Sequence, residues 1–203
     1  MIRGVIFDLD GVIVTTDDCH YRAWKRMADE EGINFDRSIN ERLRGVSRMD
    51  SLSIILERAG KPYTEAQKEE MAARKNRYYV DLISALTPED ILPGALEVIN
   101  ALKAKGIRVA SGSSSRNTPI ILRQIGLSNA FDAVSDGNQI THSKPHPEVF
   151  LLAAKLLQLP PAECLVVEDA DAGIEAALAG GMKALGVGSA AKNPRATYRA
   201  ETL

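Results

Sequence analysis

Three short apolar runs, each followed directly by acidic or small polar residues, constrain the fold of this chain most. They cover residues 5–7, 107–110 and 164–167. Brief runs rich in β-branched residues are typical of the buried strands of a parallel sheet. Amphipathic helical patterns, such as residues 96–102 and 149–157, lie between them. This alternation predicts an α/β fold with a Rossmann-like, doubly wound parallel sheet and right-handed crossovers.

One long segment breaks the alternation, because residues 17–86 contain only helical patterns. Ser47 is a candidate N-cap for the second of three helices, and the third begins near Thr64. A run of helices directly after the first strand predicts an α-helical cap inserted into the core. We place the helical cap domain at residues 15–92 and the catalytic core domain at residues 1–14 and 93–203.

The carboxyl-terminal part of the chain has weaker signals. Residues 133–134 and 184–187 are candidate strands, but they are short. After Val187 the sequence turns to small and polar residues without apolar periodicity. We therefore expect a frayed end with no closing strand or helix.

Composition excludes several classes of protein. The chain has 203 residues, 45% of them hydrophobic, which is enough to bury a core. Its net charge of −2 argues against a nucleic-acid binder held by phosphate contacts, and no window reaches the length of a membrane span. The amino terminus lacks a signal-peptide pattern, and Cys19 and Cys164 fit no disulfide or zinc spacing. We expect a cytoplasmic monomer without nucleic-acid or membrane partners.

Acidic residues follow the first and third apolar runs, where an open parallel sheet binds its ligands. Asp8 and Asp10 are two residues apart, so their repulsion predicts either a divalent cation or a raised pKa. Glu168 and Asp169 offer the hard oxygen ligands that Mg²⁺ prefers. Taken alone, the aspartate pair could equally cap a loop.

Hydroxyl and cationic groups follow the other candidate strands. Residues 111–115 (Ser-Gly-Ser-Ser-Ser) precede a helix expected from about Asn117, and hydroxyls with amide groups can cradle a phosphate. Lys144 stands before Pro145 near another expected helix. Each signal alone is typical of an ordinary turn or a solvated charge. Together they provide a nucleophile, an acid/base group, a hydroxyl donor, a cation and metal ligands at one edge of the sheet.

These residues resemble the four motifs of the haloacid dehalogenase superfamily of phosphotransferases. The motifs are residues 7–12 (Phe-Asp-Leu-Asp-Gly-Val), Ser113, Lys144-Pro145 and Glu168-Asp169. Further segments resemble its β-phosphoglucomutase subfamily: His20 with Ala23-Trp24, residues 44–48, residues 74–76 and residues 115–117. The similarity covers nearly all of residues 1–188.

The resemblance implies a role for each matching residue. Asp8 would become an aspartyl phosphate, Asp10 would be the acid/base, and Ser113 and Lys144 would hold the transferring phosphoryl group. Mg²⁺ would lie on Asp8, the Asp10 carbonyl and Asp169, with Glu168 in support. The implied substrate-binding residues are His20, Trp24, Gly45, Val46, Arg48, Lys75, Ser115, Arg116 and Asn117.

The implied reaction converts β-D-glucose 1-phosphate to glucose 6-phosphate through glucose 1,6-bisphosphate, so the partner would be a small phosphosugar. A Mg²⁺-dependent sugar-phosphate phosphatase is the nearest alternative. A phospho-receiver domain is a distant one, because such a domain needs no helical insertion. A dehalogenase would leave Asp10 and the Mg²⁺ ligands without a role. Thr15 stands where the subfamily carries an aspartate, at the expected hinge, which bears on cap closure and on the balance between mutase and phosphatase activity.

Overall fold

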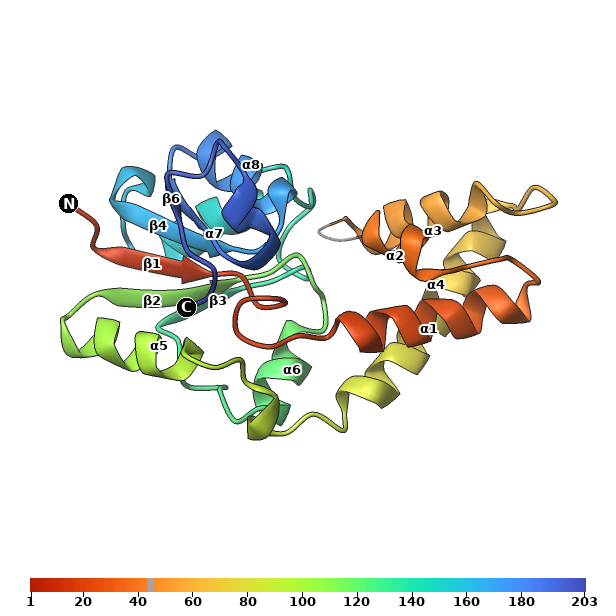
Figure 1. Ribbon diagram of the computed structural model, residues 1–203, viewed down its shortest axis with the longest axis horizontal. Helices are drawn as coiled ribbons and strands as arrows, with labels where there is room; N and C mark the ends of the chain where they lie inside the picture. Colours follow the sequence, from red (N-terminus) through yellow and green to blue (C-terminus); the bar gives the residue numbers. More distant parts are fainter. Residues whose placement is uncertain (44–45) are drawn as a thin grey trace.

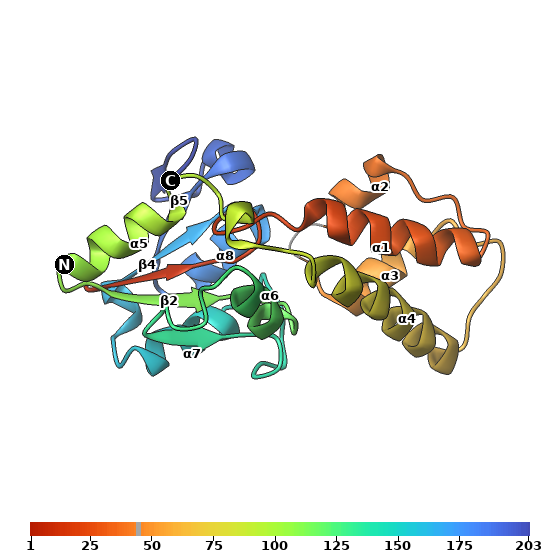
Figure 2. The same ribbon diagram turned by 90° about the horizontal axis from the view of Figure 1, so that it is seen from below.

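The structure is a computed structural model that describes residues 1–43 and 46–203. A sheet covered by helices forms one part of the molecule, and helices α1 to α4 form the other (Figure 1). The cap helices α1 and α4 run side by side in both views (Figure 2). In the described ranges, no helix combines the length and the apolar character of a transmembrane segment.

The core contains a sheet whose paired strands are all parallel, in the order β3-β2-β1-β4-β5-β6. In the centre, Ile6 pairs with Ala110 on one side and with Val166 on the other. The predicted Rossmann-like fold and both weak strand candidates are confirmed. The strands are β1 (Gly4–Phe7), β2 (Arg108–Gly112), β3 (Ala133–Ser135), β4 (Cys164–Glu168), β5 (Lys183–Gly186) and β6 (Tyr198–Arg199).

Helices cover both faces of this sheet. Successive side chains of a strand point to opposite faces, and the apolar side chains of β1 are buried on each of them. Val5 and Phe7 belong to the apolar cluster that includes residues of α5 (Ala95–Ala104) and α6 (Thr118–Gln124). Ile6, between them, belongs to the cluster on the other face. Residues of α7 (Glu148–Leu156) and α8 (Asp171–Ala179) complete that second cluster, and Cys164 is buried in it as a small apolar side chain.

The cap is a bundle with its own apolar core. Its helices are α1 (Asp17–Glu30), α2 (Arg37–Glu41), α3 (Arg48–Leu56) and α4 (Glu65–Ile83). Ser47 caps α3 by accepting the Asp50 N–H, as predicted. Thr64, near which the third helix was expected to begin, caps α4 and forms a capping box with Gln67. Trp24, buried among the cap residues, shares their cluster with Leu52. Helix α2 was not predicted, because five residues are too few to show a helical period.

The chain passes between core and cap at two neighbouring points. Val14 forms an antiparallel bridge with Ile91, and the Leu92 N–H donates to the Ile13 carbonyl over 2.8 Å. The short helix η1 (Pro88–Asp90) precedes the return crossing. Tyr79 and Ile83, near the end of α4, pack into a cluster of the core. The exact domain boundaries stay a prediction.

The expectation of a frayed carboxyl-terminal segment was wrong. Beyond η2 (Pro161–Glu163) and β5, the chain forms η3 (Gly188–Lys192) and then strand β6, which pairs with β5. Ala190 and Ala196 are buried, and the Thr197 hydroxyl accepts the Ala184 N–H over 3.1 Å. Small side chains and backbone pairing hold this segment, so it shows no hydrophobic period.

Candidate active site

A cavity of about 770 Å³ lies between the carboxyl edge of the sheet and the cap. It is lined by every predicted site residue that the structure describes, whereas Gly45 lies outside the described residues. The core and its loops contribute Asp8, Asp10, Ser113, Ser115, Arg116, Asn117, Lys144, Glu168 and Asp169, and the cap side contributes His20, Trp24, Val46, Arg48 and Lys75. The structure therefore brings these residues together, while their individual roles stay predictions.

Asp8 and Lys144 form the buried centre of the site. Asp8 directly follows β1, and its N–H donates to the Val167 carbonyl, which fixes the start of the loop. The Lys144 Nζ lies 2.7 Å from Asp8 Oδ1 and 2.8 Å from Glu168 Oε2. Burial disfavours the charged ammonium, but the two carboxylates outweigh it and raise the pKa of Lys144. Lys144 is thus a fixed cation beside the candidate nucleophile.

The Asp8, Glu168 and Asp169 carboxylates form a cluster whose ligand atoms lie within 4.8 Å of one another. Burial, followed by the charge of Asp8, raises the pKa of both Glu168 and Asp169. Gly11, at φ +83°, leaves room for this cluster, because a Cβ there would lie 2.1 Å from Asp169 Oδ2. Closely spaced hard oxygen donors fit Mg²⁺, which would remove their mutual repulsion.

Glu168 is positioned by its own loop and by helix α8. Its Oε1 accepts the N–H groups of Asp169 and Ala170 over 3.2 and 3.1 Å. A Cβ on Gly173 would lie 2.0 Å from the Glu168 carboxylate, so only glycine fits there. Gly173 is a site-supporting residue that the sequence analysis missed.

The Asp10 carboxylate is held by Thr16, at the point where the chain enters the cap. The backbone N–H and the hydroxyl of Thr16 each donate to Asp10 over 2.6 Å. The Thr16 hydroxyl also lies 2.9 Å from the Tyr79 hydroxyl of α4. Burial raises the pKa of Asp10 to about 6, although the Thr16 hydrogen bonds act in the opposite direction. Such a pKa suits an acid/base group that works near neutral pH.

A buried lysine and a histidine from the cap face Asp10. The Lys75 Nζ lies 2.9 Å from His20 Nδ1 and 4.7 Å from the centre of the Trp24 ring. The His20 Nε2 lies 3.9 Å from Asp10 Oδ2. Burial lowers the pKa of Lys75, and the positive charge of Arg48 lowers it further. Burial also lowers the pKa of His20, and the positive charge of Lys75 adds to this effect. Both groups therefore lie in a region of positive potential.

Two arginines extend this positive region across the boundary between cap and core. Arg48 begins α3, and Arg116 follows β2 in the core. Burial lowers the pKa of Arg48, and the positive charge of Arg116 lowers it further. A phosphate can pair with two guanidinium groups at once, so Arg48 with the neighbouring Arg116 is a natural phosphate-binding site.

The serines and the asparagine after β2 also line the cavity. Ser113 is buried, and its Oγ accepts the Ser115 N–H over 3.2 Å. The Asn117 side chain donates to Asn76 Oδ1 of the cap over 2.9 Å. This last contact joins core and cap across the site, so Asn76 also contributes to the site.

Thr16, Tyr79, Asn76 and Gly173 were not among the predicted site residues. Thr16 occupies the N-cap position of α1, yet its side chain makes no capping hydrogen bond. In a sequence, a threonine before a helix indicates a cap, and a tyrosine on an apolar helix face indicates packing. Only the folded structure shows that these two hydroxyls meet beside Asp10.

The sequence model of a family described as haloacid dehalogenase-like hydrolase matches residues 2–181 of this chain. The chain is 48% identical over 189 residues to a β-phosphoglucomutase from Bacillus subtilis, covering 92% of this chain and 84% of that protein. It is 30% identical over 185 residues to a phosphatase of phosphorylated carbohydrates from Thermotoga maritima, covering 90% of this chain and 83% of that protein.

The fold agrees closely with a solved structure. The crystal structure of a β-phosphoglucomutase from Clostridium difficile matches with a TM-score of 0.94 and 41% sequence identity. The match covers 100% of this chain and 92% of that one. At this level of agreement, cap and core have the same arrangement in both proteins.

Proposed function

This chain belongs to the haloacid dehalogenase-like hydrolase family, and we propose that it is a β-phosphoglucomutase. It converts β-D-glucose 1-phosphate to glucose 6-phosphate through glucose 1,6-bisphosphate. One observation supports this function most directly: the same cavity is lined by Asp8 with Lys144 and by a second pair of cations, Arg48 and Arg116. A bisphosphate intermediate needs both pairs, whereas hydrolysis of a monophosphate needs only the first.

The catalytic steps assign Asp8 as the phosphoryl carrier. An aspartyl phosphate on Asp8 gives its phosphoryl group to the 6-hydroxyl of the bound sugar, and the hydroxyl proton passes to Asp10. After the bisphosphate has turned, Asp8 attacks the other phosphorus, and its bond to the O1 oxygen breaks. Asp10 returns the proton to that oxygen. A carboxylate nucleophile thus splits one transfer into two steps, so that the group can reach a different hydroxyl.

Residues around Asp8 neutralise the charge of the transferring group. Lys144, already between Asp8 and Glu168, is placed to pair with the phosphoryl oxygens, and Ser113 adds a hydroxyl. We propose Mg²⁺ as the cofactor, held by Asp8, the Asp10 carbonyl and Asp169 with Glu168 in support. When bound, Mg²⁺ supplies further positive charge to the phosphoryl oxygens.

The mutase function is tested by following both products from one substrate. β-Glucose 1-phosphate is supplied with Mg²⁺ and a trace of glucose 1,6-bisphosphate, and glucose 6-phosphate and inorganic phosphate are measured together. We expect glucose 6-phosphate to form much faster than phosphate. Phosphate as the main product would contradict the proposal.

The phosphatase is the second candidate, and two observations favour it. The Thermotoga maritima relative is named as a phosphatase of phosphorylated carbohydrates, and Thr15 stands where the mutase subfamily carries an aspartate. In that case the same Asp8 would pass its phosphoryl group to water. The cytoplasmic location, the monomeric state, and the lack of nucleic-acid and membrane partners remain predictions from the sequence.

A further inference from the structure

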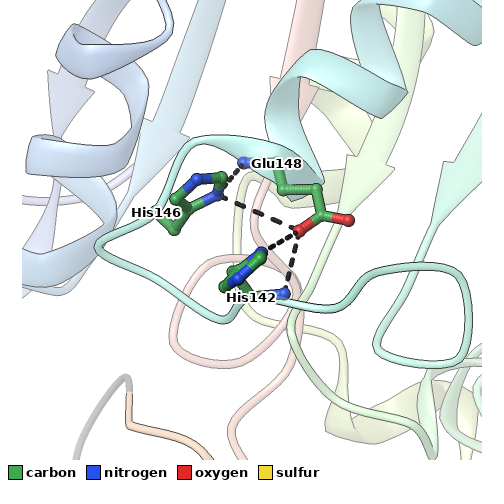
Figure 3. A group of neighbouring side chains, drawn as sticks. All are labelled: His142, His146 and Glu148. Carbon is green, nitrogen blue, oxygen red and sulfur yellow. Dashed lines mark hydrogen bonds and ion pairs between the residues drawn. The ribbon is translucent and has the colours of Figure 1, made fainter.

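A group of metal-ligating side chains lies outside the proposed active-site residues, on the segment between β3 and α7 and on the first residue of α7. It consists of His142, His146 and Glu148, and it includes two of the three histidines of the chain. Figure 3 shows both imidazole rings beside the Glu148 carboxylate. We call these three residues the histidine cluster.

The donor atoms of the histidine cluster have nearly the spacing of metal ligands. The His142 Nδ1 lies 3.0 Å from Glu148 Oε2, and the His146 Nδ1 lies 3.9 Å from the same oxygen. Ligands about 2.0–2.1 Å from a tetrahedral Zn²⁺ are about 3.3 Å from each other. The ring centres of the two histidines are 4.6 Å apart, so small rotations of the side chains suffice.

Hydrogen bonds already orient the carboxylate and one ring. Glu148 accepts the N–H groups of Thr141 and His142 over 3.0 and 2.8 Å, which holds the loop against the start of α7. The Glu148 N–H donates to His146 Nδ1 over 3.3 Å, so that nitrogen is unprotonated, and a metal would displace this hydrogen bond to take its lone pair. Metal binding at His142 Nδ1 requires the other tautomer of this ring: the Nδ1 proton, now directed at Glu148, leaves to solvent while Nε2 takes up a proton from solvent, so the imidazole stays neutral.

We propose that the histidine cluster is a binding site for a divalent transition-metal ion of the Zn²⁺ type, separate from the Mg²⁺ site. Two imidazoles and one carboxylate suit Zn²⁺, whereas the Asp8 cluster offers only the oxygen ligands that suit Mg²⁺. The rings of His142 and His146 are more than half exposed, so water can complete the coordination shell.

The histidine cluster lies on the loop that carries Lys144, so a bound metal would affect the stability of this loop. Lys144 lies between the two histidines in sequence, and its ammonium group faces Asp8 in the active site. An ion that ties both ends of the segment to α7 would stabilise the loop that carries this lysine. Binding should therefore be visible in stability as well as in direct titration.

The test is calorimetric titration of the whole protein with ZnCl₂ in saturating Mg²⁺. The variants are His142→Ala, His146→Ala and the double variant, and Asp169→Asn is the matched control that alters only the oxygen cluster. We expect the wild type and Asp169→Asn each to bind one equivalent of Zn²⁺ that the double variant does not bind. Each single variant should weaken binding by at least about 10-fold.

Thermal unfolding gives a second, independent readout. Zn²⁺ should raise the melting temperature of the wild type and leave that of the double variant unchanged. The metal-free melting temperatures of the two proteins should agree, because both rings are exposed, and this agreement shows that the variant is folded. Equal Zn²⁺ binding by wild type and double variant, or no binding by the wild type, would overturn the proposal.

Discussion

Thr16 donates two hydrogen bonds to the Asp10 carboxylate, one from its backbone N–H and one from its hydroxyl. Asp10 belongs to the loop after β1, whereas Thr16 lies at the start of the cap, and its hydroxyl also meets Tyr79 on the returning helix α4. The orientation of Asp10, the proposed acid/base group, is therefore tied to the point where the chain passes from core to cap.

Thr16→Val should slow mutase turnover by about 10-fold or more, because it removes a hydrogen bond to a charged group while keeping the shape of the side chain. Steady-state kcat measures the effect. Thr16→Ser keeps the hydroxyl and should retain most of the activity. If the valine variant turned over at the wild-type rate, the Thr16 hydroxyl would have no part in positioning Asp10.

Asp8→Asn should abolish turnover and phosphoenzyme formation, since a neutral amide is a poor nucleophile. Intact-protein mass spectrometry after exposure to glucose 1,6-bisphosphate detects the added phosphoryl group in the wild type. Asp81→Asn, on an exposed part of α4, is the matched control and should behave as wild type. A phosphorylated Asp8→Asn protein would place the nucleophile elsewhere.

Arg48→Ala should separate mutase from phosphatase activity. The lost contact to the non-reacting phosphate costs about 1.5–3 kcal/mol, or about 10- to 150-fold in glucose 6-phosphate formation. Hydrolysis of para-nitrophenyl phosphate, which has no second phosphate, should barely change. Arg48→Lys keeps the charge, so its rate of glucose 6-phosphate formation should lie between those of the wild type and Arg48→Ala. An equal loss on both substrates would make Arg48 a general structural residue of the cap.

Removing the metal should make stability depend on pH. Burial and the Asp8 charge raise the pKa of Asp169 in the folded protein above its usual value near 4. The folded protein then binds more protons than the unfolded chain, so stability falls as pH rises above about 4. Melting temperatures in EDTA should show this fall, whereas Mg²⁺ or Asp169→Asn should reduce it.

EDTA should also stop turnover, and Mg²⁺ should restore it. Metal-independent turnover, or identical pH profiles in EDTA and Mg²⁺, would contradict the assignment.

Gly173→Ala should destabilise the protein and disturb the active site together. The added Cβ would lie 2.0 Å from the Glu168 carboxylate, and overpacking of this kind typically costs about 1–3 kcal/mol. Urea unfolding measures the cost. Gly60→Ala is the control, because a Cβ there meets nothing within 4 Å. Equal stability of the two variants would show that Glu168 can move aside freely.

The sequence predicted those parts of the fold and site that short-range patterns encode. Residues 5–7 and 164–167 show as strands because their side chains, apart from the half-buried Leu165, are buried on both faces of the sheet, and Asp8 and Glu168 follow them directly. Ser47 and Thr64 show as helix caps because a cap depends on the next three residues. These signals are local, so they can be read without the fold.

The remaining features depend on contacts between distant parts of the chain. Thr16 meets Tyr79 across 63 residues, and the residues around β6 are held by small side chains and backbone pairing with β5. Gly173 must be glycine because the Glu168 carboxylate of the preceding strand fills the space of a Cβ, not because its backbone forms a turn. None of these contacts leaves a period or motif in the sequence.

The bridge between Val14 and Ile91 makes the cap a replaceable module. Because the chain leaves and re-enters the core at adjacent points, a linker of a few residues could span the gap and leave the register of the parallel strands intact. A different insertion could begin and end at the same two positions without lengthening any other connection. Its base would still have to cover the apolar surface now occupied by Tyr79 and Ile83. Cap exchange at this point would thus change substrate selection while the phosphoryl-transfer residues stayed in place.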